Sequence, residues 1–205
     1  MSSWREAVPQ SDGHGLYILG EQVVSRDEAY VQRVLAQEAV KACGDSGRLL
    51  ETGYGLGMSS ESLGRGLRSR HWIVEGNYWL ASAMMSDLSL RDSCIVSGLW
   101  EEFVVGVADG FFANVYFDPY VFDFQVGQDA TWQERFIFAI RQGGTDIFRV
   151  VEPGGKIFFL NFAPELGDEW AQGLSSRIVW AGPVSAGSSS ICQEAGIECW
   201  ALRLG

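Results

Sequence analysis

The sequence predicts an α/β fold with a mostly parallel central sheet flanked by helices. Short apolar runs alternate with segments of helical periodicity, and a glycine-rich turn follows the first of these runs. Strands separated by helices are joined by right-handed crossovers, which set the strands parallel. Ligands of such sheets bind beyond the carboxyl ends of the strands. Those ends are therefore the place to look for chemistry.

The helices and strands are expected in a regular order. Residues 25–43 carry apolar side chains at helical spacing, and the turn at 44–47 ends that helix. Further helices are expected over residues 59–69, 77–87 and 131–151, the last interrupted by Gly143-Gly144. Strands are expected over residues 48–52, 71–75, 94–96, 113–117 and 156–162, with later candidates over 177–180 and 198–204.

Composition limits the classes of partner. The chain has 205 residues, with 15 Lys and Arg against 26 Asp and Glu, for a net charge of −11. This acidity argues against nucleic acid, whose partners carry basic stripes. The four cysteines form no CxxC pair, so we expect buried thiols and no metal site. No apolar run is long enough to span a membrane, and no signal segment is evident. We expect a soluble cytoplasmic protein.

The first strand ends in a glycine-rich turn, Glu51-Thr52-Gly53-Tyr54-Gly55-Leu56-Gly57-Met58. Glycines at such a turn allow a tight bend and a close approach of the backbone to a ligand. A dinucleotide fingerprint requires a glycine where this chain has Met58, and no Gly-Lys-Ser/Thr follows. The turn is thus neither a dinucleotide fingerprint nor a phosphate-binding loop.

About 20 residues further on, the second strand ends in Glu75, where an acidic side chain holds ribose hydroxyls in Rossmann-type sites. Turn and carboxylate together resemble class I S-adenosylmethionine-dependent methyltransferases. The resemblance implies that Gly53, Gly55 and Gly57 line the methionine part of the cofactor and that Glu75 holds its ribose. It also places three further turn residues at the cofactor: Glu51, Tyr54 and Met58. A glycine-rich turn of another α/β protein is the competing interpretation.

Five segments of the chain resemble, in their order and spacing, those of guanidinoacetate N-methyltransferase and its guanidino-methylating relatives. The likeness runs from about residue 27 to about residue 161. The segments are Leu50-Glu51-Thr52-Gly53-Tyr54-Gly55, His71-Trp72-Ile73-Val74-Glu75, Gly98-Leu99-Trp100-Glu101, Tyr116-Phe117-Asp118-Pro119-Tyr120 and Val151-Glu152-Pro153-Gly154-Gly155. It implies one Rossmann-like class I methyltransferase domain over residues 1–205, in which 1–25 cover the substrate and 26–205 form the core.

The family resemblance also implies which residues bind the substrate. A carboxylate that closes the fourth strand binds the guanidino group, here Asp118, with Tyr120 beside it. The family continues Asp-Thr-Tyr-Pro, whereas this chain has Asp-Pro-Tyr-Val. A second carboxylate precedes the first strand; Asp27 fits, and Glu28 is its rival. The resemblance places Leu99 and Trp100 at the adenine and Asp118 at the junction of cofactor and substrate. Backbone groups after the fifth strand fall at Phe162 and Ala163.

The chemistry of a guanidino group explains this choice of residues. A guanidinium is a planar fork of donors that carboxylates bind bidentately. Its pKa exceeds about 12, so its nitrogens are poor nucleophiles and must be positioned. We assign Asp118 to orientation and proton acceptance, and Asp27 to guanidinium binding. Ser25 and Glu28 form a capping-box pattern, which would occupy Glu28 and leave Asp27 free. Asp118 at a turn and Asp27 in a first helical turn also have purely structural interpretations.

Other functions remain open from the sequence. The acceptor is guanidinoacetate, arginine or a guanidino-bearing natural product. An amine or hydroxyl acceptor is the second hypothesis, and a non-catalytic methyltransferase-like subunit that binds a partner protein is the third. No basic residue adjoins Asp118 to recognise a substrate carboxylate. Residues 123–129 are a candidate cover for the site. The C-terminal part leaves so little room that we expect either a shortened sheet or a rebuilt segment near Trp180. A homodimer is one oligomeric state compatible with these features.

Overall fold

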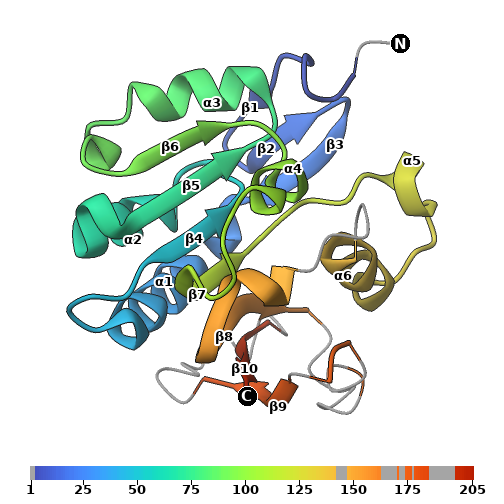
Figure 1. The fold of residues 1–205 in the computed structure, drawn as a ribbon. Coiled ribbons are helices and arrows are strands. Elements are labelled where there is room, and N and C mark those ends of the chain that lie inside the picture. The colour runs from blue at the N-terminus through green and yellow to red at the C-terminus, as the bar shows by residue number, and fades with distance from the viewer. Residues whose placement is uncertain (1–2, 142–146, 163–169, 171–173, 177, 185–196) are drawn as a thin grey trace.

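The computed structural model describes residues 3–141, 147–162, 170, 174–176, 178–184 and 197–205. These residues form a seven-stranded sheet, a separate three-stranded sheet and the helices around them (Figure 1). The strand order of the large sheet is β6-β5-β4-β7-β8-β10-β9. Its strands are β4 (Leu49–Thr52), β5 (His71–Glu75), β6 (Cys94–Ser97), β7 (Phe112–Phe117), β8 (Val151–Asn161), β9 (Ile178–Pro183) and β10 (Glu198–Leu204).

The parallel part of the sheet confirms the predicted fold class. Strands β6, β5, β4, β7 and β8 run parallel to one another, and Leu49 of β4 pairs with His71 on one side and Asn114 on the other. The helices of the described residues are α1 (Ala29–Cys43), α2 (Ser60–Leu67), α3 (Tyr78–Met85), α4 (Trp100–Val105), α5 (Asp123–Val126) and α6 (Trp132–Ile140). Short 3-10 turns cover η1 (Arg26–Glu28), η2 (Arg68–Arg70), η3 (Leu88–Leu90) and η5 (Ile147–Val150).

Alternation along the central strands divides the core into two layers. Leu49, Tyr116 and Phe158 face α1 and α2, where they pack with Leu35 and Leu63. Their sequence neighbours face the opposite layer, which contains α4, α6 and η5: Leu50, Val115, Phe117, Ile157 and Phe159. A strand buried on both faces is expected to be continuously apolar. This explains why the central strands lack the polar alternation of a surface sheet.

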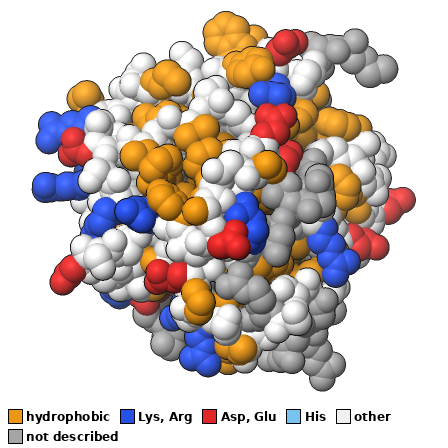
Figure 2. Space-filling view, in the orientation of Figure 1, with side chains coloured by type: hydrophobic (Ala, Val, Ile, Leu, Met, Phe, Trp, Pro, Cys, Tyr) orange, Lys and Arg blue, Asp and Glu red, His pale blue; other side chains and the backbone are white. Residues whose placement is uncertain are grey.

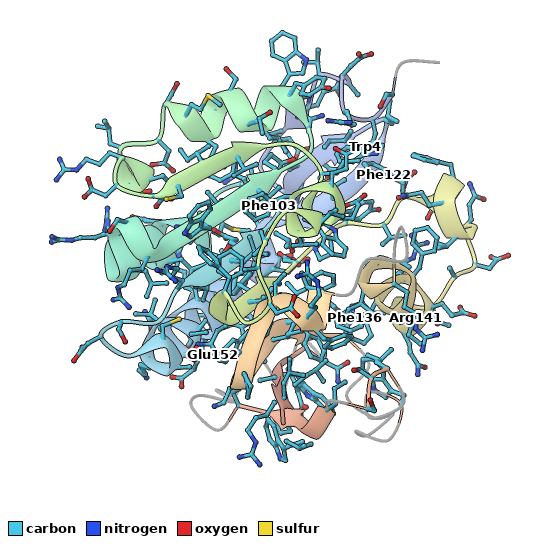
Figure 3. All side chains as sticks on the ribbon, in the orientation of Figure 1. Trp4, Phe103, Phe122, Phe136, Arg141 and Glu152 are labelled. Carbon is cyan, nitrogen blue, oxygen red and sulfur yellow. The ribbon has the colours of Figure 1, made fainter. Side chains whose placement is uncertain are left out.

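Aromatic rings fill the second layer near β5. The ring centroid of Trp72 lies 6.0 Å from that of Phe103 and 5.6 Å from that of Phe111, and all three side chains are partly buried. Figure 2 shows hydrophobic side chains gathered on this face of the molecule, and Figure 3 labels Phe103 within it. Rings therefore pack against one another in this part of the layer, where each buries a large area.

Three local elements differ from the sequence prediction. The helix expected over 131–151 ends at Ile140 in the described residues, and η5 follows residues 142–146, which lie outside them. The strand expected from residue 156 begins at Val151, so that Pro153-Gly154-Gly155 lies inside β8; there Gly155 approaches so closely that an added Cβ would be 2.3 Å from the Ala113 carbonyl oxygen. Helix α4 and the N-terminal strands were not predicted, because each is too short for periodicity to reveal.

The expectation of a shortened sheet was wrong. Strand β10 pairs antiparallel with β8 from Glu198↔Asn161 to Arg203↔Lys156, and β9 pairs with β10 at the edge. These two strands extend the sheet beyond β8. No helix within the described ranges has the length and apolarity that crossing a membrane requires. Cys43 and Cys199 are buried thiols as expected, Cys94 is only partly buried, and Cys192 lies outside the described residues.

Candidate functional site

A cavity of about 410 Å³ lies beyond the carboxyl ends of β4, β5 and β7. Its size falls within the range of small-molecule sites, about 300–1,000 Å³. The glycine turn forms its floor, and the three-stranded sheet β1 (Gln10–Ser11), β2 (Gly15–Ile18) and β3 (Glu21–Ser25) covers it. Trp4 adds to this roof with its ring centroid 5.4 Å from that of Phe122, and Figure 3 shows the two rings close together.

The glycine turn has the conformation that its composition predicts. Gly53 has φ +91° and donates its N–H to the Val74 carbonyl at 2.8 Å. A Cβ on Gly53 would lie 2.9 Å from the Asp118 carbonyl oxygen, so the turn also requires glycine for space. Gly53, Tyr54 and Gly55 line the cavity, as predicted. Gly57 packs against the Tyr54 ring outside the lining.

Two predicted cofactor residues therefore lie apart from the cavity wall. Gly57 has φ +72° and donates its N–H to the Tyr54 carbonyl at 2.8 Å, which tightens the turn. Neither Gly57 nor Met58 is among the residues that line the cavity. These two residues shape the turn, and the residues before them, 53–56, line the cavity.

Glu75 joins the glycine turn to the end of β5. Its Oε2 accepts the Tyr54 N–H at 2.8 Å and its Oε1 accepts the Asn77 N–H at 2.7 Å. Burial raises the pKa of the Glu75 carboxyl, and these backbone donors oppose that rise. The carboxyl group lines the cavity beside Gly76. It is placed where the ribose-binding prediction puts it.

Glu51 is directed away from the cavity, contrary to the prediction. It lies on the face of β4 that packs on α2, where its Oε1 accepts the hydroxyls of Ser59 at 2.6 Å and Ser60 at 2.9 Å. Its Oε2 lies 2.9 Å from Nε2 of His71, and the Nδ1 of His71 lies 3.0 Å from the Ser93 hydroxyl. Because side chains alternate along a strand, Glu51 and Leu50 point to opposite faces. Glu51 is a fully buried structural carboxylate.

Leu99 and Trp100 line the cavity at the start of α4, where the resemblance puts the adenine. The Trp100 ring packs edge-on against Phe117 with 5.3 Å between centroids, and Trp100 is only 6% exposed. Trp100 thus belongs both to the hydrophobic core and to the wall of the cavity.

The side chain of Gln32 bridges two of the carboxyl groups expected at the substrate, those of Glu28 and Asp118. Nε2 of Gln32 donates to Oε2 of Glu28 at 3.3 Å and to Oδ2 of Asp118 at 3.4 Å. Glu28, Gln32 and Asp118 all line the cavity. Burial, with the nearby carboxylates of Glu28 and Glu51, raises the pKa of Asp118 to about 7. Burial likewise raises the pKa of Glu28.

The structure does not bring Asp27 to the cavity. Asp27 is exposed and absent from the lining, and its N–H donates to the Ser25 hydroxyl at 3.3 Å. Of the two carboxyl groups that the sequence left as alternatives, the structure thus places Glu28, and not Asp27, at the cavity. The capping pattern misled the assignment, because Ser25 caps η1 through Asp27 while the Glu28 side chain remains available to Gln32.

Tyr120 and Phe162 line the cavity as predicted, and Ala163 lies outside the described residues. The Tyr120 hydroxyl donates to Oε2 of Glu21 at 3.2 Å. Burial and this carboxylate raise the pKa of Tyr120 to about 12. Gln125, from α5, also lines the cavity, in the segment predicted to cover the site.

Several lining residues were missed by the sequence analysis. Gln32 follows Glu28 by four residues in a helix, a spacing that places both on one face and could have revealed it. The aromatic residues of α6 and β8 carried no such signal, because the same pattern describes plain core. These residues are Trp132, Phe136 and Phe159.

The chain is similar over 98% of its length to spermidine synthase from Thermotoga maritima, of which it covers 72%, with 12% identity and a TM-score of 0.57. It is similar over its full length to TYW2 of M. jannaschii, solved in complex with AdoMet, of which it covers 87%, with 10% identity and a TM-score of 0.53. These likenesses show the fold alone, a mostly parallel sheet flanked by helices.

A family model described as guanidinoacetate N-methyltransferase matches residues 1–172 of the 205. That match includes the glycine turn, Glu75, Glu28 and Asp118. The chain therefore belongs to the guanidinoacetate N-methyltransferase family, a family of S-adenosylmethionine-dependent methyltransferases.

Proposed function

We propose that this protein transfers a methyl group from S-adenosylmethionine to a guanidino nitrogen of a small molecule. The observation that supports this acceptor is the pair of carboxyl groups of Glu28 and Asp118. Both groups line the same cavity, and both accept a hydrogen bond from Gln32. Two carboxylates offer four oxygens to a planar cation that presents five or more N–H donors. An amine with a single nitrogen would engage fewer of those oxygens.

The residues present fit the cofactor. Gly53 and Gly55 leave the floor of the cavity free of side chains, and Glu75 offers oxygens beside that floor. Leu99 and Trp100 provide apolar surface for an aromatic base. When bound, S-adenosylmethionine supplies an electrophilic methyl group on a sulfonium. Titration calorimetry with S-adenosylmethionine tests this step, and an absence of heat and of thermal stabilisation would favour the non-catalytic subunit.

Asp118 has the properties of the proton acceptor. As the new N–C bond forms and the C–S bond breaks, the guanidino nitrogen becomes acidic and releases one proton. A carboxyl whose pKa is about 7 without a ligand is close to the working pH, and a bound guanidinium lowers that pKa so that the carboxylate form predominates. Glu28 and Asp118 together orient the group, and the proton passes to Oδ of Asp118.

An assay with methyl-labelled S-adenosylmethionine and a panel of guanidines, amines and alcohols tests the acceptor class. We expect label in guanidines, and we expect Asp118→Asn to remove turnover while calorimetry still detects the cofactor. Label in amines or alcohols but in no guanidine would instead support the second hypothesis. Full turnover of a guanidine by Asp118→Asn would exclude Asp118 as the anchor.

A further inference from the structure

Gln32 is a buried amide in the wall of the cavity, only 4% exposed. It lies on α1 one helical turn after Glu28, so the helix sets the two side chains beside each other. Its Nε2 carries two hydrogens, and two oxygens accept from it: Oε2 of Glu28 at 3.3 Å and Oδ2 of Asp118 at 3.4 Å. An amide turned the other way would set its oxygen against two carboxyl groups, so this pair determines which end of the amide faces them.

The groups around the two carboxyls are themselves acidic. Asp27 precedes Glu28 in the chain and acts on it as a like charge. Burial, with Glu28 and Glu51 as like charges, raises the pKa of Asp118 to about 7. The imidazole of His71 is bonded to Glu51, with 2.9 Å between Nε2 and Oε2. The pair therefore needs a donor of its own to remain ionised side by side.

The described residues around the pair supply that donor as a neutral group. Arg135 is the single Lys or Arg among the described lining residues. Its guanidinium donates to four acceptors within residues 121–130, among them Oδ1 of Asp123 at 2.6 Å. The phenol of Tyr116, two residues before Asp118, is fully buried, and burial raises its pKa well above the ordinary value, so it brings no charge. The amide of Gln32 is the group that bridges the two carboxyls.

We infer that Gln32 is a positioning residue, whose neutral amide keeps the carboxyl groups of Glu28 and Asp118 directed to the same point of the cavity before an acceptor binds. This inference rests on the proposed function, because the pair serves to bind a cationic acceptor. Without a shared donor, two carboxylates relieve their repulsion by turning apart or by taking up a proton. Either response weakens the bidentate contacts that a guanidinium makes with ionised oxygens.

This role predicts an effect on kcat/KM that depends on pH and leaves kcat nearly unchanged. Once a guanidinium is bound, its own N–H groups hold both carboxyls, so the amide matters for the free enzyme. Burial raises the pKa of Glu28, and the Gln32 donor opposes that rise. Without the amide, more of the pair is protonated in mildly acidic solution. In alkaline solution the pair is ionised with or without the amide, and the difference narrows.

Gln32→Met removes the amide and nearly keeps the length of the side chain. With guanidinoacetate as the acceptor, we expect kcat/KM to fall at least about fivefold at about pH 6 and to stay within about twofold of wild type at about pH 9, with kcat within about twofold at both. Gln37→Met is the matched control, because Gln37 is exposed on the same helix and outside the lining. An equal loss at both pH values, a loss carried by kcat, or wild-type kinetics at about pH 6 would overturn the inference.

Carbon NMR of the side-chain carboxyls in the acceptor-free protein measures the same effect without turnover. We expect the titration midpoints of Glu28 and Asp118 to lie at higher pH in Gln32→Met than in the wild type. Gln32→Asn keeps an amide one carbon shorter and should shift them in the same direction, because reach rather than polarity decides the contact. Thermal unfolding checks that both variants are folded.

The two possible failures are distinguishable. Unchanged midpoints in Gln32→Met, in an enzyme that labels guanidines, would overturn the role of Gln32 and leave guanidino methylation standing. If the wild type labels no guanidine in the panel, the proposed function itself fails, and the positioning role fails with it.

Discussion

Glu28 and Asp118, far apart in the sequence, accept hydrogen bonds from the same nitrogen, Nε2 of Gln32. This shared donor holds two acidic groups together in a cavity where they would otherwise repel each other. A bound cation would replace that neutral amide as the partner of both carboxyls. The pairing also makes the second carboxylate testable, because Asp27 lies beside Glu28 in the sequence and outside the cavity.

We predict that Glu28→Gln lowers kcat/KM for a guanidine acceptor by about 10- to 100-fold, the range of one lost charge-assisted hydrogen bond. Asp27→Asn is the matched control and should change kcat/KM by less than about twofold, because Asp27 is exposed. Steady-state kinetics at saturating S-adenosylmethionine measures both. A larger loss in Asp27→Asn than in Glu28→Gln would restore Asp27 to the site.

The raised pKa of Asp118 predicts how stability changes with pH. The folded-state pKa of about 7 lies above the ordinary aspartate pKa of 3.8, so the folded protein binds more protons than the unfolded chain between these values. The contribution of Asp118 is therefore most favourable below about pH 4 and is lost as pH rises through about 7. Urea unfolding at about pH 5 and about pH 8 should show this loss in the wild type and a smaller loss in Asp118→Asn. An unchanged pH dependence in the variant would contradict the prediction.

The buried carboxylate of Glu51 predicts a large effect on stability. Glu51→Gln leaves Ser59, Ser60 and His71 with a poorer partner in a site that has no access to water, so we expect a loss of roughly 3 kcal/mol in the free energy of unfolding. Glu61→Gln is the control on α2, where Glu61 makes an exposed pair with Arg65 at 2.9 Å and should change stability by less than about 1 kcal/mol. Chemical denaturation compares the two, and equal losses would refute the structural role.

The glycine turn predicts a coupled loss of stability and of cofactor affinity. Gly53→Ala forces a side chain into φ +91° and to within 2.9 Å of the Asp118 backbone, at a cost of about 1–3 kcal/mol. Gly98→Ala is the control, because a Cβ at Gly98 meets nothing within 4 Å. Thermal unfolding and calorimetric binding of S-adenosylmethionine measure both effects. Wild-type behaviour of Gly53→Ala in both measurements would show that the turn does not need this glycine.

The sequence predicted the parts of the fold that repeat along the chain and missed the parts created by tertiary contact. Strands β4, β5 and β7 were found because each carries a short apolar stretch, and Gly53 and Glu75 were picked out by the spacing that the family resemblance also uses. The direction of Glu51 could not be read, because alternation fixes which residues share a face and not which face meets the cavity. Glu28 was placed second to Asp27 for a related reason. The two residues are neighbours in the sequence, and only the rotation of the backbone at this point decides which side chain faces the cavity.

The aromatic wall shows a different limit of sequence reasoning. Trp132 and Phe136 have the spacing of one helix face, which is the signature of core packing as much as of a binding surface. Only the position of α6 beside the end of β8 exposes part of that face to the cavity. Arg135, between them, is assigned to the loop by its four acceptors and by nothing in its sequence neighbourhood.

Strand β10 comes after β9 in the chain but lies inside the sheet, between β8 and β9. During synthesis on the ribosome, the edge of β8 therefore stays unpaired until the residues of β10 have emerged. Strand β9 is made earlier but also lacks its partner until then, because it pairs with β10. An open apolar edge is a template for pairing with other chains. A chain that stops before residue 198 would thus leave this edge unpaired and yield an aggregation-prone product.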